Sequence, residues 1–152
     1  MGNSFGCQIL TEFAVRYPQY VDRLVFQGPT IDRTARSLRQ QLGRLLINSR
    51  REQRSMGWIT IVDYGSAGLR RAWATVKLAL SDRIEEKLPR IQAPVLVIRG
   101  ERDAVVPQRW AEEVVRLLPK GHLQVIPSGA HTINYSLPRE FAAALIPFLE
   151  LR

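Results

Sequence analysis

The segment VLVIRGERD, Val95–Asp103, is the clearest structural signal in this 152-residue sequence. A short, mostly apolar run that ends in glycine and polar turn residues is typical of a strand buried on both faces of a parallel sheet. The same pattern recurs in Arg23–Gln27 (RLVFQ) and in His122–Ile126 (HLQVI). The sequence therefore predicts three strands, each buried on both faces.

Helix-like segments alternate with these strands. Apolar residues recur at helical spacing in Phe5–Tyr17, Leu69–Leu80, Gln108–Leu118 and Pro138–Leu149. Prolines stand where the chain returns to a strand, as expected where helices must end. The alternation predicts an α/β domain with a parallel sheet of about three strands flanked by helices.

The stretch from Thr30 to Gly68 interrupts this alternation and is too long for an ordinary connection. We expect a mostly helical insertion packed over the strand ends, with a short strand-like patch at Trp58–Val62. Two uses are open for Trp58 and Trp73, lining an apolar cleft or packing in the core, and core packing is favoured.

The first part of this insertion is strongly basic. Seven arginines and a single acid between Arg33 and Arg54 give it a net charge of +6. It is either a face that binds anions or nucleic acid or a solvated helix face above an apolar stripe. The second interpretation is favoured because apolar residues recur at helical spacing among the arginines, at Ala35, Leu38, Leu42, Leu45 and Leu46.

The overall composition excludes several classes of protein. Hydrophobic residues make up 45% and charged residues 24%, as in ordinary globular domains, and the net charge is +8. The single cysteine, Cys7, excludes an internal disulfide and is expected to be packed, and no spacing predicts a metal or an organic cofactor. No apolar run is long enough for a membrane span, and the first residues lack the pattern of a secretory signal. We expect a cytoplasmic protein with no membrane or nucleic-acid partner.

A possible reactive centre begins with Gly2-Asn3-Ser4-Phe5-Gly6, which has the form G-x-S-x-G. In this pattern a serine lies on a sharp strand-to-helix turn, and the flanking glycines let neighbouring segments pass closely. The amphipathic segment Phe5–Tyr17 follows at once, as the pattern requires. Ser4 is therefore a candidate nucleophile with Gly2 and Gly6 as elbow glycines, and a helix N-cap is its alternative role.

Two further candidate side chains follow strand ends. Asp103 comes shortly after VLVIR, and His131 comes shortly after HLQVI. Ligands and catalytic groups gather at the carboxyl ends of strands in open parallel sheets. Taken singly, Asp103 fits a turn residue and His131 an ordinary loop histidine. Together with Ser4, in the chain order Ser, Asp, His, they favour a catalytic triad.

Three segments carry a resemblance to a known family: GNSFG, IQAPVLVIRGERDAVVP and IPSGAHTINYSLPREFAAALIPFL. With these segments the chain resembles the C-terminal half of an α/β-hydrolase-fold protein, from the nucleophile elbow onward. It is similar to cap-bearing esterases and carbon–carbon-bond hydrolases. The resemblance implies a partial α/β-hydrolase fold, with the elbow, its helix and the first retained strand in residues 1–29, a helical cap in 30–68, and the C-terminal part of the core in 69–152.

The resemblance also implies a role for each candidate residue. Ser4 is the nucleophile, His131 removes its proton and later protonates the leaving group, and Asp103 fixes the imidazole tautomer and stabilises its cation. The backbone N–H of Phe5 donates to the oxyanion. The implied function is a serine hydrolase of a small ester or related carbonyl substrate, without a cofactor.

The chain departs from the family pattern ahead of Ser4, where only three residues stand. The strand that leads into the elbow and the loop with the second oxyanion donor have no counterpart, so we expect a truncated chain that is weak or inactive alone. Arg23–Gln27 is then expected to expose an apolar edge that invites a second copy or a complementing chain. The alternative function is a non-catalytic interaction module that binds through this edge or through the basic insert.

Overall fold

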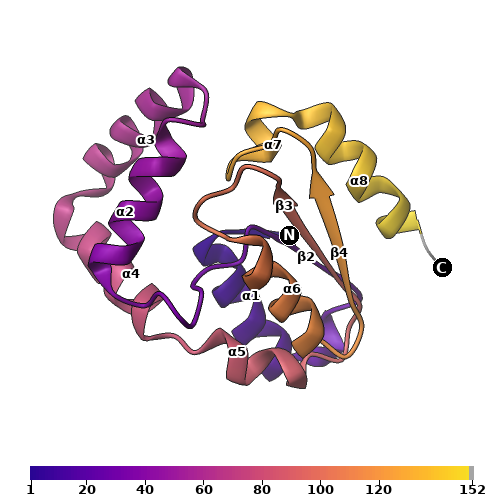
Figure 1. Ribbon diagram of the computed structural model, residues 1–152. Coiled ribbons are helices and arrows are strands. Elements are labelled where there is room, and N and C mark those ends of the chain that lie inside the picture. Colours follow the sequence, from indigo (N-terminus) through magenta and orange to yellow (C-terminus); the bar gives the residue numbers. More distant parts are fainter. Residues whose placement is uncertain (151–152) are drawn as a thin grey trace.

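The computed structural model of the chain describes residues 1–150, and these form one parallel sheet with helices on both faces (Figure 1). The strand order is β1-β2-β3-β4, and each neighbouring pair is parallel. The strands are β1 (Gly2–Asn3), β2 (Leu24–Gln27), β3 (Val95–Gly100) and β4 (Gly121–Ile126). The predicted α/β class and parallel sheet are confirmed, with β1 as a fourth strand.

The additional strand is too short for its sequence to reveal it. β1 has two residues, Gly2 and Asn3, which pair with Phe26 and Gln27 of β2. Neither residue has the apolar or β-branched side chain that marks a strand. Because β1 reaches only the end of β2, it places Ser4 directly at the carboxyl edge of the sheet.

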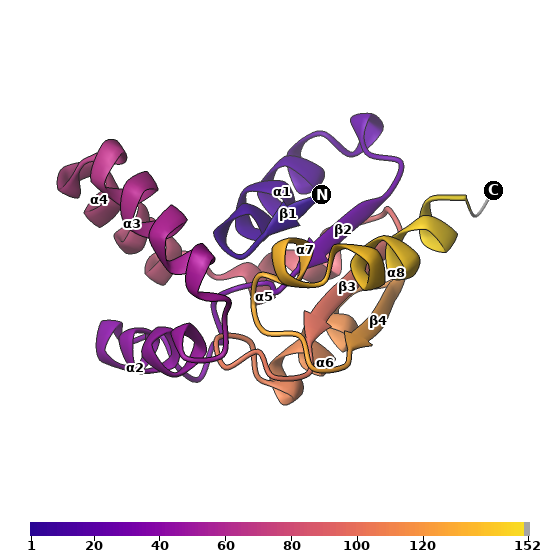
Figure 2. The same cartoon turned by 90° about the horizontal axis from the view of Figure 1, so that it is seen from above.

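The helices cover the sheet in two layers (Figures 1 and 2). In β3, Val95 and Val97 belong to an apolar cluster with α1, α5 and α6, whereas Leu96 and Ile98 belong to a cluster with α7 and α8. Successive side chains of a strand point to opposite faces, so one strand supplies both cores. The bounds are α1 (Phe5–Arg16), α5 (Ile84–Lys87), α6 (Gln108–Leu117), α7 (Ile133–Ser136), α8 (Pro138–Glu150), and the 3-10 turns η1 (Pro18–Tyr20) and η2 (Leu88–Arg90).

The prediction that all three strands are buried on both faces is wrong for β4. Every residue of β2 and β3 is buried, but β4 alternates between partly buried and exposed residues and only its last residue, Ile126, is buried. His122 and Gln124 are the exposed positions of β4, which is the last strand in the sheet order. HLQVI is therefore an alternating, half-buried edge strand rather than a central one.

Residues 38–81 form three helices that project from the core, α2 (Leu38–Ser49), α3 (Arg54–Ala67) and α4 (Leu69–Ser81), so α4 lies beside α3 although the predicted insertion ends at Gly68 (Figures 1 and 2). We call α2, α3 and α4 the three-helix insertion. Its predicted helical character is confirmed, but the expected strand-like patch at Trp58–Val62 is wrong, because it is part of α3. α2 begins with a capping box in which Ser37 and Gln40 each bind the other's backbone N–H.

The expected packing of the apolar residues in this region is also wrong. Leu42 and Leu46 of α2 are more than half exposed, at 56% and 58%, and the buried residues of α2 are Gln41 and Asn48. Trp58 is 71% exposed and Trp73 is 49% exposed, so neither packs in the core. The physical reason is the outward position of the helices: no residue of α3 or α4 is buried.

The arginines of the basic stretch serve in part to join the insertion to the core. Arg36 forms an ion pair with Glu85, and Arg44 and Arg109 both bind the buried Asp32. Arg33 pairs with Glu113 of α6 in the same way. The net charge of this stretch is therefore partly neutralised by acids of the fold. None of the helices within residues 1–150 has the length and hydropathy of a membrane span.

Candidate active site

Ser4 occupies a strained turn between β1 and α1. Its backbone angles are φ 52° and ψ −117°, and its N–H donates to the carbonyl of Gln27 over 2.9 Å. Such a conformation costs a non-glycine residue about 1–3 kcal/mol, so it persists only where the surrounding structure holds it. Here β1 and α1 hold it from both sides, and this is the backbone geometry that the G-x-S-x-G pattern predicts.

The two elbow glycines differ in what surrounds them. A Cβ atom on Gly2 would lie 2.8 Å from the backbone C and O of Gly6, so Gly2 has no room for a side chain. A Cβ atom on Gly6 would meet no atom within 4 Å outside its own helix. The close approach therefore requires glycine at position 2 only.

Cys7 lies behind the elbow and is fully buried, as expected. Its thiol donates to the carbonyl of Gly2, with 3.2 Å between Sγ and O. Burial raises the pKa of the Cys7 thiol, because the thiolate would lose its hydration. The residue therefore acts as a packed thiol that supports β1.

Phe5 is the first residue of α1, directly after Ser4. The first N–H groups of a helix have no carbonyl partner within that helix, and they point outward at its positive end. The backbone N–H of Phe5 is one of these groups, next to Ser4 in the chain and at the end of α1 that favours a negative charge.

The structure brings Asp103 and His131 into direct contact. Oδ2 of Asp103 lies 2.8 Å from Nδ1 of His131, and both side chains are almost fully buried. The second oxygen, Oδ1, accepts the backbone N–H groups of Val105 and Val106 at 2.8 and 2.9 Å. An ionised carboxylate can only accept, so Nδ1 carries the proton and Nε2 of His131 is left as a hydrogen-bond acceptor.

Nε2 of His131 is buried and has no hydrogen-bond partner. Buried polar atoms without partners are uncommon, and they are a feature of reactive sites. No hydrogen bond joins this atom to Oγ of Ser4 among the described residues. Ser4 and His131 nevertheless both lie at the carboxyl end of β2. The N–H of Ser4 donates to the carbonyl of Gln27, and the next residue, Gly28, packs against the His131 ring.

Gln27 and Gly28 also belong to the site, although the sequence pattern does not predict them there. The Gln27 amide donates to the carbonyl of His131 at 3.2 Å and to Oδ1 of Asn134 at 2.8 Å. Gly28 has φ 53°, and a Cβ atom there would lie 2.7 Å from Cε1 of His131. A polar residue at the end of a buried strand and a glycine just after it were the available signals.

The buried Arg99 organises the loop that carries Asp103. Its guanidinium donates to the carbonyls of Val106 and Asp103 at 3.0 and 3.2 Å, and to Oε1 of Gln108 at 2.6 Å. Desolvation lowers the pKa of Arg99, and the charge of Asp103 opposes that change. The loop therefore wraps around a fixed cation, which holds Asp103 in place.

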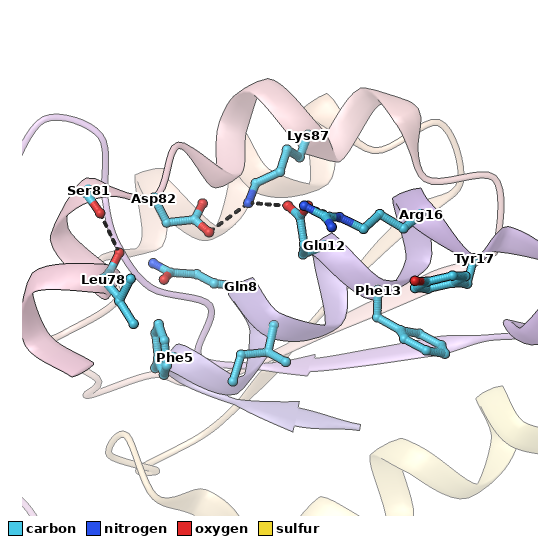
Figure 3. Close-up of a pocket in the computed structure, with 11 residues that line it drawn as sticks. Phe5, Gln8, Glu12, Phe13, Arg16, Tyr17, Leu78, Ser81, Asp82 and Lys87 are labelled. Carbon is cyan, nitrogen blue, oxygen red and sulfur yellow. Dashed lines mark hydrogen bonds and ion pairs between the residues drawn. The ribbon is translucent and has the colours of Figure 1, made fainter. Parts of the chain in front are cut away.

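A groove lies away from the three candidate triad residues. It has a volume of about 590 Å³ and runs between α1 and the end of α4 (Figure 3). Phe5 lines it, whereas Ser4, Asp103 and His131 do not. Along one side of the groove Lys87 bridges Glu12 and Asp82 (Figure 3). Within residues 1–150, no group of three or more His, Cys, Asp or Glu side chains could hold a metal ion.

Residues 1–144 match the profile of the alpha/beta hydrolase family. Two curated relatives match part of the chain. Serine hydrolase BPHL of Homo sapiens is 32% identical over 41% of this chain and 22% of its own length. A putative non-heme chloroperoxidase of Synechocystis sp. is 32% identical over 43% of this chain and 24% of its own length.

The fold is similar to that of solved structures. A bromoperoxidase from Bacillus anthracis superimposes with a TM-score of 0.77 at 16% identity, over 99% of this chain and 66% of that protein. At this identity the likeness concerns the fold alone. The chain matches about a quarter of the length of the two curated relatives and two thirds of this solved structure.

Proposed function

This chain belongs to the alpha/beta hydrolase family, and on that premise we propose that it is a serine hydrolase of a small ester or related carbonyl compound. Ser4 is its nucleophile, and His131 and Asp103 complete the triad. The observation that carries the proposal is the buried His131–Asp103 pair, whose free Nε2 lies at the strand edge where the strained Ser4 turn also ends.

In the first half of the reaction, Oγ of Ser4 attacks the substrate carbonyl carbon while its proton passes to Nε2 of His131. Asp103 keeps the imidazole in the required tautomer and stabilises the imidazolium. The oxygen of the tetrahedral intermediate becomes negative and is met by the N–H of Phe5. His131 then gives its proton to the leaving alcohol, which departs and leaves an acyl group on Ser4.

In the second half, water attacks the acyl carbon and gives its proton to His131. The bond between Oγ of Ser4 and the acyl carbon breaks, and Oγ recovers the proton from the imidazolium. The products are the carboxylic acid and the regenerated serine. Oγ must reach within about 2.6–3.2 Å of Nε2 during this cycle, and such contacts often tighten only when substrate is bound.

The proposed nucleophile, acid–base pair and oxyanion donor suit attack on a carbonyl group, and they do not select one substrate. A carbon–carbon-bond hydrolase uses the same nucleophile and the same acid–base pair, so an ester and an activated carbon–carbon bond are both within the proposal. A panel of short p-nitrophenyl esters and vinylogous diketones separates the two reactions.

A fluorophosphonate probe tests the proposed nucleophile. The activated serine displaces fluoride from phosphorus, so labelling needs both Ser4 and a functional base. We expect slow labelling of the wild-type chain, in line with the weak activity expected of the chain alone, and loss of this labelling in Ser4→Ala and in His131→Ala. Ser128→Ala is the matched control, because Ser128 also has a positive φ but is exposed. Labelling that survives Ser4→Ala contradicts the proposal.

A binding role without catalysis is the second candidate function. It is favoured by the apolar side chains that the three-helix insertion exposes, among them Trp58 at 71% and Leu69 at 87%. Exposed apolar surface of this extent often marks a site of protein contact. If the wild-type chain carries no label although it is folded, this second function replaces the first.

A further inference from the structure

The loop between α2 and α3 carries a carboxylate that binds the residue next to His131. Oε1 of Glu52 accepts the backbone N–H of Thr132 at 2.8 Å, and Oε2 accepts the Thr132 hydroxyl at 2.5 Å. Asn48 donates to the same carboxylate at 2.9 Å, which fixes its orientation. Hydrogen bonds to a carboxylate are about twice as strong as neutral ones, so Glu52 holds Thr132 by two strong contacts.

The same end of α2 also binds the loop that carries Asp103. The guanidinium of Arg51 donates to the carbonyl of Arg102 at 2.7 Å, and the backbone N–H of Ala104 approaches Oδ1 of Asn48 at 3.5 Å. Arg102 and Ala104 stand immediately before and after Asp103 in the chain. One short segment, residues 48–52, therefore contacts both loops of the His131–Asp103 pair.

This contact explains the unexpected burial on α2. Asn48 is 6% exposed although the neighbouring leucines of the helix lie in solvent. The buried amide links Glu52 to the Asp103 loop, because it donates to Glu52 and accepts from Ala104. The helix is thus packed by polar contacts to the site rather than by an apolar stripe.

We propose that Glu52 is a positioning residue, through which the three-helix insertion holds His131 in register with Asp103. The core holds the ring of His131 through Asp103 and the close packing of Gly28, and it holds the His131 backbone through the Gln27 bond to its carbonyl. Glu52 adds two hydrogen bonds to the next residue, Thr132, and these bonds connect the insertion to the His131 loop. When the insertion moves away from the core, the His131 loop loses these bonds and the base is no longer aligned. The inference rests on the proposed serine hydrolase function.

The rate of fluorophosphonate labelling tests this role. Glu52→Ala is expected to slow labelling of Ser4 by at least tenfold and up to about 100-fold, as displacement of a catalytic group by about 1 Å does. Glu52→Gln keeps one acceptor oxygen for the Thr132 N–H and is expected to recover most of the rate. Gln53→Ala is the matched control, because it removes a neighbouring contact from the same loop, to the carbonyl of Ser136, and is expected to label at the wild-type rate.

A nuclear magnetic resonance experiment separates failure of this inference from failure of the proposed function. The chain has two histidines, so the ring signals of His131 and His122 can be assigned with one variant. We expect the Nδ1 proton of His131 to give a far-downfield signal from its bond to Asp103, and to exchange faster with water in Glu52→Ala. The His122 signals serve as the internal reference for an intact fold.

Each outcome has a distinct meaning. If Glu52→Ala labels at the wild-type rate and leaves the His131 signal unchanged, the inference is overturned while the proposed function stands. If the wild-type chain is not labelled, the proposed function fails, and the His131 signal still reports whether Glu52 holds the ring. If Glu52→Ala does not fold, Thr132→Val is used, which removes the hydroxyl contact and keeps the backbone one. A wild-type His131 signal and labelling rate in folded Thr132→Val overturn the inference, and a smaller loss in the same direction supports it.

Discussion

Gly28 and His131 are packed so closely that position 28 cannot hold a side chain. A Cβ atom there would lie 2.7 Å from Cε1 and 2.9 Å from Nδ1 of His131, and it would approach Oδ2 of Asp103 to 3.3 Å. Gly28 also has φ 53°, a backbone conformation that glycine adopts without strain. The end of β2 is therefore shaped to seat the imidazole against its carboxylate.

Gly28→Ala is expected to displace the His131 ring and to destabilise the fold by about 1–3 kcal/mol, from strain and overpacking together. Labelling of Ser4 by the fluorophosphonate is expected to fall with it. Urea denaturation and the labelling rate measure the two effects. Gly65→Ala is the control, because a Cβ atom on this residue of α3 meets nothing within 4 Å. An unchanged labelling rate in Gly28→Ala would show that the ring does not need this seat.

The elbow glycines are expected to differ in their tolerance of alanine. Gly2→Ala forces a Cβ atom to within 2.8 Å of the Gly6 backbone, so it must shift β1 or α1 and with them Ser4. Gly6→Ala meets no neighbour and suits the helix in which it stands. The ratio of labelling rates for the two variants measures this. Equal loss in both would place the steric requirement elsewhere in the turn.

Asp32 is expected to make stability depend on pH in the acid range. Burial alone raises the pKa of this carboxyl, but hydrogen bonds from Thr34, Arg44 and Arg109 outweigh it and lower the pKa from 3.8 to about 2. Because the pKa is lower in the folded state, this stabilisation is complete above the unfolded-state pKa and is lost as the pH falls towards about 2.

Asp32→Asn tests this dependence on pH. It is expected to flatten the fall in the free energy of unfolding between pH 4 and pH 2, and to be less stable than wild type at pH 7, where Arg44 and Arg109 lose their anionic partner. Urea titrations at several pH values give both results. Parallel curves for the two proteins over the acid range would mean that Asp32 is not held as an anion.

The three tryptophans are expected to report separately on the insertion and the core. Trp58 and Trp73 are 71% and 49% exposed, whereas Trp110 is fully buried and its indole N–H donates to the carbonyl of Pro29 at 2.9 Å. A Trp58→Phe, Trp73→Phe variant, which retains only Trp110, is expected to emit at shorter wavelength and to resist quenching by acrylamide. Strong protection of Trp58 in the wild-type chain would instead indicate that a second copy covers α3.

The elements predicted correctly from the sequence are those whose side chains follow a strong local pattern. Val95–Arg99 is buried on both faces, and the amphipathic segment Gln108–Leu118 corresponds to α6. The β-branched residues of Trp58–Val62 favour a strand, yet this segment is helical in α3. The apolar residues of α3 do not gather on one face of the helix, so they show no helical period in the sequence.

In the candidate site too, the residues that follow a local sequence pattern can be predicted, and those that depend on a distant contact cannot. Ser4, Asp103 and His131 could be proposed because each follows a strand end in a recognisable order. Glu52 could not, because its contact joins residues 80 positions apart and depends on where the insertion docks. A glutamate in an arginine-rich loop looks like an ordinary surface residue until the fold places it beside Thr132.

The most direct test of the proposed triad is a crystal structure of the chain after reaction with a small fluorophosphonate. We expect a phosphoryl group on Oγ of Ser4, with one phosphoryl oxygen about 3 Å from the N–H of Phe5 and Nε2 of His131 within about 3.2 Å of Oγ. A phosphoryl group on another residue, or an Nε2 atom turned away from Ser4 beyond hydrogen-bond reach, would contradict it.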